Sequence, residues 1–188
     1  MATIGTAPTD PVTAHNVTRF SQEEAEAIHS RMARLSLAEL DTLFQDAPPP
    51  EFPAIRGNTA GAWLAKPPQD YWWARWFIHV FLDSPWARWS GKGFLTGYQD
   101  GARGRGVNLF HNRVRPQRFP MQLYLAPSET DNAPCLVIRY PLGSLMYGLI
   151  DEVRQVEDGV FLGRMLYKFP WNKSRLFIGY FVLCALEE

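Results

Sequence analysis

The chain has 188 residues, the length of one ordinary domain, with 46% hydrophobic and 20% charged residues. This composition excludes a wholly disordered chain. Lys plus Arg and Asp plus Glu are both 19, so the formal net charge is zero. A protein without net basicity offers no long-range field to a polyanion, and we expect no nucleic-acid partner.

The N-terminal residues 1–20 are polar and contain Pro, and we expect a flexible arm there. Residues 21–188 are expected to form a single domain. The arm lacks the charged start and apolar stretch of a secretory signal. Uncharged apolar stretches such as 140–150 fall short of the roughly 20 residues that span a bilayer as a helix. We therefore predict a cytoplasmic protein without a membrane span.

Two short helices follow the arm, each introduced by a capping box. The segments Ser21-Gln-Glu-Glu24 and Ser36-Leu-Ala-Glu39 both place a Ser oxygen and a Glu carboxylate at the positions that satisfy the first free amides of a helix. They predict helices over about 22–34 and 37–45. Helices of this length are marginal alone and must dock on another element.

An aromatic segment over 70–82 has apolar residues at helical spacing, which predicts an amphipathic helix. Core packing explains part of the aromatic content. The alternative is a wall or lid over a hydrophobic ligand, because flat, rigid side chains bury a large apolar area. The aromatic residues assigned to such a ligand site are Trp72, Trp73, Trp76, Phe77 and Trp89.

From residue 91 to the end, the pattern is typical of strands joined by short turns. Asp158-Gly159 is the clearest hairpin signal. The sequence predicts a mainly β protein: an antiparallel, lipocalin-like (calycin-like) barrel with N-terminal helices that cap one end or cover one face. The strand candidates are 92–99, 105–115, 119–126, 134–140, 148–156, 159–169 and 174–185.

Three segments resemble those of small bacterial proteins that contain a G-x-W-x-G element. They are Gly61-Ala-Trp63, Trp89-Ser-Gly-Lys-Gly-Phe94 and Asp151-Glu-Val-Arg-Gln-Val-Glu-Asp-Gly-Val-Phe-Leu-Gly163, and they occur in the same order. The resemblance covers residues 57–185. It implies a lipocalin-like small barrel and assigns no chemistry, because the functions of those proteins are largely unassigned.

Glu152 and Arg154 are the strongest candidates for chemistry within a predicted strand. Side chains two residues apart share a face, so both address one volume, whereas Asp151 points to the other face. In a dry lumen this pair would orient a polar ligand group or act in acid–base catalysis. A structural ion pair is the competing explanation.

The remaining candidates are a histidine, two tyrosines and three apolar side chains. His111 lies within a predicted strand and is a candidate general base or donor, with a half-buried structural histidine as the alternative. Tyr140 and Tyr147 would polarise a substrate. No His or carboxylate spacing is typical of a metal site, and no cofactor is predicted. The apolar residues expected to line the lumen are Phe110, Met165 and Tyr167.

The two cysteines, Cys135 and Cys184, lie in apolar runs and are predicted to be small buried hydrophobic side chains. A disulfide between neighbouring strands stays open, as does a homodimer.

The predicted function is binding of a hydrophobic, partly polar small organic molecule in the barrel lumen by a cofactor-independent cyclase, isomerase or lyase. The polar residues interleaved along the strands favour an enzyme over a non-catalytic carrier. A protein-interaction module that uses the aromatic helix is the third alternative. A filled lumen would leave only the interaction module. An open, apolar lumen with one anchoring Arg would favour a carrier, and an open lumen with converging acid and base would favour the enzyme.

Overall fold

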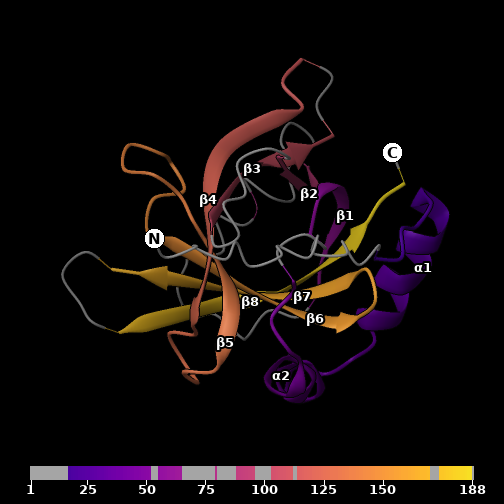
Figure 1. The fold of residues 1–188 in the computed structure, drawn as a ribbon, viewed down its shortest axis with the longest axis horizontal. Coiled ribbons are helices and arrows are strands. Elements are labelled where there is room, and N and C mark those ends of the chain that lie inside the picture. The colour runs from indigo at the N-terminus through magenta and orange to yellow at the C-terminus, as the bar shows by residue number, and fades with distance from the viewer. Residues whose placement is uncertain are drawn as a thin grey trace, which may run out of the picture.

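A computed structural model describes residues 17–51, 55–64, 79, 88–95, 103–111, 114–169 and 174–187. Eight antiparallel strands close into one barrel in chain order, and β8 pairs with β1 (Figure 1). The fold class predicted from sequence is confirmed. The strands are β1 Gly57–Trp63, β2 Trp89–Phe94, β3 Arg103–Phe110, β4 Gln117–Pro127, β5 Pro134–Arg139, β6 Leu149–Glu157, β7 Val160–Lys168 and β8 Arg175–Ala185.

The barrel has one strand more than the seven predicted. The segment of β1 was not among the predicted strands, yet it pairs with β8 along five residues and with β2 at its start. Its small residues lack the β-branched and aromatic character that marks a strand. They are required by close packing instead, since a Cβ on Gly61 would lie 2.6 Å from the Trp89 ring.

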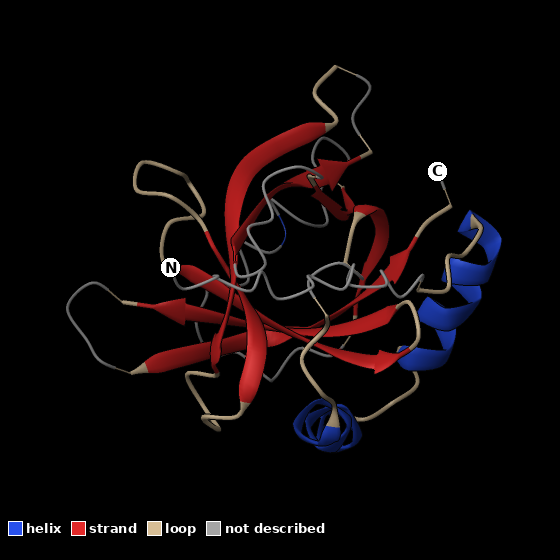
Figure 2. Cartoon of the chain, in the orientation of Figure 1, coloured by secondary structure: helices blue, strands red, loops and turns tan. Residues whose placement is uncertain are grey.

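The two described helices are α1 Gln22–Met32 and α2 Leu37–Asp46, and both begin with the predicted capping boxes. They lie on the outer face of the barrel wall (Figure 2). They bury Ala25, Met32, Leu40 and Phe44 in a cluster with Val160, Leu162, Tyr180 and Val182. Of the two predicted placements, α1 and α2 therefore cover a face of the barrel and do not close an end.

The last residues of the predicted arm are held against the barrel. The Thr18 hydroxyl and backbone amide both donate to Asp158, and Phe20 forms a bridge with Leu186. The predicted arm is thus fastened at its C-terminal end to the β6–β7 turn. Residues 1–16 lie outside the described residues.

The two cysteines form no disulfide. Cys135 and Cys184 are both free and buried, as predicted for small hydrophobic side chains.

Within the described part of the chain, neither helix has the length and apolar content needed to cross a bilayer. The helix predicted over 70–82 lies outside the described residues, apart from His79.

Candidate functional site

The lumen of the barrel is an apolar core built from every strand. Alternate side chains point inward, so β6 contributes Leu149, Asp151 and Val153 while Ile150, Glu152 and Arg154 point outward. The buried apolar members of the lumen are Ile55, Trp89, Phe94, Phe110, Met121, Leu123, Leu136, Ile138, Tyr140, Met146, Leu149, Val153, Phe161, Met165, Ile178, Phe181, Leu183 and Ala185.

A buried lysine stands at the centre of this core. The Lys92 Nζ donates to Asn108 Oδ1 at 3.0 Å, to the Tyr140 hydroxyl at 2.9 Å and to Asp151 Oδ2 at 2.8 Å. The Lys92 and Asp151 side chains are 2% and 0% exposed. Three acceptors satisfy the three N–H groups of the ammonium, which is what a buried charge requires.

The partners of Lys92 also bind one another. Tyr140 donates to Asp151 Oδ2 at 3.1 Å and accepts from Asn108 Nδ2 at 3.0 Å. The Trp89 Nε1 donates to Asn108 Oδ1 at 3.1 Å. We call Lys92, Asn108, Tyr140 and Asp151 the lumen network. Its members come from β2, β3, the end of β5 and β6, so it ties four strands together across the core.

Local backbone features aim Lys92 and Trp89 into the same volume. Residues three apart on a regular strand face opposite sides, but a register shift between Trp89 and Gly91 brings both side chains inward. The Thr59 hydroxyl accepts from the Lys92 amide at 3.1 Å and donates to the Lys92 carbonyl at 2.8 Å. Thr59 therefore holds β2 beside β1 where the lysine must point inward.

Aromatic rings surround the ammonium. Lys92 Nζ lies 5.7, 5.6 and 5.4 Å from the ring centroids of Trp89, Tyr140 and Phe181. These distances allow cation–π attraction, which strengthens when water is excluded. Gly163 makes room for the Phe181 ring, because a Cβ there would approach that ring to 2.1 Å.

A small cavity adjoins the lumen network. Its volume is about 10 Å³, which is room for roughly one water molecule. Two buried polar atoms of the lumen, Asp151 Oδ1 and Trp63 Nε1, have no hydrogen-bond partner. The cavity is lined by Trp63, Trp89, Lys92, Asn108, Tyr140, Met146, Leu149, Met165 and Phe181.

The surroundings of Lys92 and Tyr140 raise the pKa of both groups. Burial acts to lower the pKa of Lys92, but the Asp151 carboxylate and the Tyr140 oxygen outweigh it, and the pKa lies above its ordinary value of 10.5. Burial, together with the charge of Asp151, raises the pKa of Tyr140 to about 12. At neutral pH the lysine is an ammonium and the tyrosine a phenol.

The ammonium places a positive charge inside the lumen with its three N–H groups already occupied, and it offers no free amine to attack a carbonyl. A protonated lysine stabilises negative charge, whereas a nucleophilic lysine needs a lowered pKa. Among the described residues, no three His, Cys, Asp or Glu side chains come together in a group that could hold a metal ion.

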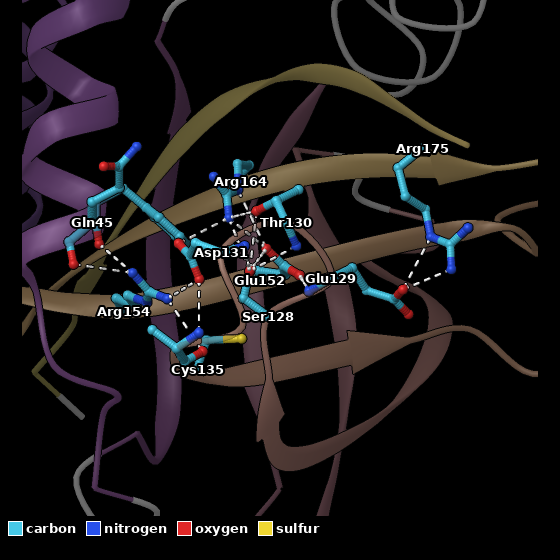
Figure 3. A network of polar contacts seen from close by, with 12 residues as sticks. Gln45, Ser128, Glu129, Thr130, Asp131, Cys135, Glu152, Arg154, Arg164 and Arg175 are labelled. Carbon is cyan, nitrogen blue, oxygen red and sulfur yellow. Dashed lines mark hydrogen bonds and ion pairs between the residues drawn. The ribbon is translucent and has the colours of Figure 1, made fainter. Parts of the chain in front are cut away.

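Glu152 and Arg154, the strongest candidates from sequence, lie outside the lumen. Glu152 Oε2 accepts from Arg164 Nη2 at 2.9 Å and from the Ser128 hydroxyl at 3.0 Å (Figure 3). The predicted shared face of Glu152 and Arg154 is therefore the outer one. The expectation that they pair with each other is replaced by separate partners, Arg164 for Glu152 and Asp131 for Arg154.

Arg154 fastens α2 to the barrel. Its Nη1 donates to the carbonyls of Phe44 at 2.9 Å and Gln45 at 3.2 Å, and its Nη2 donates to Asp131 at 2.7 Å (Figure 3). The last carbonyls of a helix have no partner within it and carry the negative end of its dipole. The Arg154 guanidinium satisfies them and explains why a 1% exposed arginine stands on this strand.

The other polar candidates divide between the lumen and the surface. Tyr140 belongs to the lumen network. His111 follows β3 and is exposed, where it lines an outer cleft of about 410 Å³ together with His29 and Arg88. Tyr147 is half exposed on the loop between β5 and β6. The structure thus does not bring His111 or Tyr147 to Tyr140.

The predicted apolar lining residues that the structure describes are all part of the lumen. Trp89 and Met165 line the cavity, Phe110 is a buried member of the same core, and Tyr167 is partly buried and packs against it. The remaining four predicted residues, Trp72, Trp73, Trp76 and Phe77, lie outside the described residues.

Sequence reasoning missed Lys92, Asn108 and Asp151 as site residues. Asp151 was set aside because it faces away from Glu152, and that opposite face is the lumen. A signal did exist in the three segments that carried the family resemblance. Trp63, Trp89, Lys92 and Asp151 all come from those segments, and the barrel brings them together around one cavity or network.

Comparisons with known proteins bear on the fold alone. No protein-family model matches the chain, and no curated protein matches it. A crystal structure of a protein from Thermomonospora curvata is similar, with 17% sequence identity and a TM-score of 0.50. The similarity covers 88% of this chain and 97% of that one. At this identity it supports a shared barrel and carries no information on ligand or activity.

The contacts of Arg154 with Asp131 and with the carbonyls at the end of α2 generate a prediction. Arg154→Met should lower the free energy of unfolding by roughly 3 kcal/mol, because Asp131 and the helix carbonyls lose a buried donor. Hydrogen exchange should show faster exchange of the α2 amides. The matched control is Arg139→Met, which breaks a more exposed ion pair with Glu129 and should cost under about 1 kcal/mol. Equal losses of unfolding free energy in the two variants would contradict the role of Arg154 in fastening α2 to the barrel.

The lumen network generates a prediction about alkaline stability. Lys92 and Tyr140 hold their protons more tightly in the folded protein, so their contribution is complete below the unfolded values of 10.5 and 10.0. It is lost as pH rises through the folded pKa values. Denaturant unfolding between pH 9 and about 12 should show a steeper loss in wild type than in Lys92→Met/Asp151→Leu. If the unfolding free energy falls equally steeply with pH in both proteins, the pKa of Lys92 is not raised by folding.

Proposed function

We propose that the protein binds a hydrophobic organic molecule in the barrel lumen and that the lumen network holds the molecule's polar, oxygen-bearing group. The observation that carries this proposal is an ion pair, Lys92–Asp151, placed at the centre of an otherwise apolar core. A buried ion pair is often no more stabilising than well-packed hydrophobic residues. Its presence at the cavity is therefore better explained by recognition than by folding.

The groups without partners support a specific mode of recognition. Trp63 Nε1 is a donor on the cavity wall, and Asp151 Oδ1 is an acceptor within the same core. A group that both accepts and donates, such as a hydroxyl, would satisfy such atoms. The aromatic and aliphatic lining would bury the rest of the molecule.

The cavity is far smaller than an organic molecule, so binding requires side chains to move. By the criterion of a filled lumen, the cavity as it stands leaves only the interaction module among the three functions considered. The lining contains Met146 and Met165, however, and methionine is the apolar side chain that adapts most readily to a changed volume. We place the displacement at Met146, since it lies on a loop at the barrel end and not on a strand.

Catalysis of a cofactor-independent cyclisation, isomerisation or elimination is the form of this function that the lumen network favours. The positive charge of Lys92 would stabilise negative charge developing on a carbonyl oxygen, once that oxygen displaces one of the three acceptors that occupy the N–H groups of the ammonium. The unpartnered Asp151 oxygen would receive a proton from carbon and return it. A non-catalytic carrier is the alternative. It would need hydrogen-bond donors and apolar walls to hold the ligand, but no group that accepts a proton from it.

Binding is tested with N-phenyl-1-naphthylamine, an apolar probe whose fluorescence rises when it leaves water. The wild-type protein should bind one molecule per chain. Met146→Trp should weaken binding at least about tenfold, because the larger side chain fills the cavity that the probe must enlarge. The matched control is Leu145→Trp, since Leu145 is the preceding residue and is 71% exposed.

Melting temperatures of both variants show whether they stay folded. Two outcomes would contradict the lumen site: no probe binding by the wild-type protein, or equal affinities of folded Met146→Trp and wild type.

A further inference from the structure

One end of the barrel carries most of the large apolar side chains that the described residues expose to solvent. In an antiparallel barrel in chain order, the loops after β1, β3, β5 and β7 emerge at the same end. The loop over 141–148, between β5 and β6, exposes Leu142 at 83%, Leu145 at 71% and Tyr147 at 50%. Val114, in the loop after β3, is 87% exposed. Leu95 and Leu125 are the exposed large apolar residues described elsewhere.

The 141–148 loop is built to hold these side chains outward. The amide of Ser144 donates to the Pro141 carbonyl at 3.1 Å, and the amide of Tyr147 donates to the Ser144 carbonyl at 3.0 Å. The Ser144 hydroxyl accepts from the amide of Met146 at 3.1 Å. Met146 points inward and lines the lumen cavity. One ordered loop therefore has apolar side chains on both its outer and its inner side.

The charged residues that the structure describes in the loops at this end are basic. Lys168 lies beside the loop, since its amide donates to the Gly148 carbonyl at 2.8 Å. Arg88 and Arg115 belong to the loops after β1 and β3 at the same end, and Arg118 is the second residue of β4. The described residues of these loops are 64, 79, 88, 111, 114–116, 141–148, 169 and 174, and none of them is acidic.

Two carboxylates among the described residues lie near these basic residues: Glu26 lines the outer cleft with Arg88 and His111, and Glu129 belongs to the loop over 128–133. Glu129 pairs with Arg139 and Arg175, and Lys168 also acts on its charge, so three cations surround one anion. Among the described residues near this end, basic side chains outnumber these two carboxylates, although the whole chain is neutral. Positive charge beside exposed Leu and Tyr side chains matches the interface of a bilayer that contains anionic lipids.

We propose that this end of the barrel docks on an anionic lipid surface. Leu142, Leu145 and Tyr147 would enter the boundary between headgroups and acyl chains, with the basic residues over the headgroups. The inference deepens the proposed function and rests on it in one respect: the lipid phase would supply or receive the apolar ligand at the loop that closes the cavity. No membrane-spanning segment is involved.

The full chain is tested by co-sedimentation with vesicles of phosphatidylglycerol and phosphatidylcholine, and of phosphatidylcholine alone. Wild type should bind the anionic vesicles at low salt, and binding should fall with added salt because surface charges are screened. Leu142→Ser/Leu145→Ser should weaken binding at least about tenfold. The matched control, Leu95→Ser, removes an exposed leucine at the opposite end and should bind like wild type.

Three outcomes would overturn the proposal: no binding to anionic vesicles, equal binding by the double variant, or equal loss in Leu95→Ser. Self-association without vesicles that the double variant abolishes would assign the surface to a second copy of the chain instead. Met146→Trp separates this proposal from the lumen site. It should still bind vesicles, whether or not the naphthylamine probe enters the lumen.

Discussion

The Lys92–Asp151 ion pair is the interaction on which the interior of this barrel depends. Two unit charges in an apolar core are costly unless each is paired and hydrogen-bonded. That requirement explains why Asn108 and Tyr140 stand where a barrel of this size would otherwise hold apolar side chains. It also explains the bulge in β2 and the Thr59 bridge, since both keep Lys92 aimed inward.

A second polar layer lies on the other side of the same wall. Along β6, Asp151 points into the lumen, whereas Glu152 and Arg154 point out beneath α2 and the loop over 128–133. The inner layer surrounds a cavity, and the outer layer has its partners within the protein. Glu152 and Arg154 bind neighbouring side chains and helix carbonyls, so they stabilise the packing of the loop and α2 rather than form a site. Adjacent residues of one strand thus belong to two separate polar networks, one in the lumen and one under α2.

Much of the fold could be predicted because it follows from local patterns. Ser21 and Ser36 mark helix starts through capping that needs only four consecutive residues. β1 could not be recognised, because its small residues are selected by contact with Trp89, which is distant in sequence. The alternation of polar and apolar residues in β6 was misleading for a related reason. Both faces of this strand are buried, one in the lumen and one under α2, so polarity did not distinguish inside from outside.

The site was predicted only in part, since its chemistry depends on contacts between distant strands. Tyr140 and the apolar lining followed from strand faces, but Lys92 was not recognised. Its partner Asp151 lies 59 positions away in the chain. The motif residues Trp63, Trp89, Lys92 and Asp151 contained the information, without indicating that they meet. Opposite charges that each lie in a predicted buried strand, in separate motifs, are the pattern that would have pointed to the site.

The central claim is that the Lys92–Asp151 pair is retained for ligand recognition and not for stability. The most direct measurement compares Lys92→Met, Asp151→Leu and the double variant in unfolding free energy and in affinity for 1-naphthol, a probe with an apolar body and one hydroxyl. Each single variant should lose about 3–5 kcal/mol, because it leaves one charge buried alone. The double variant should recover most of that stability and still bind the hydroxylated probe at least about tenfold more weakly than wild type. A double variant as unstable as the single variants, or one that binds the probe like wild type, would contradict the account.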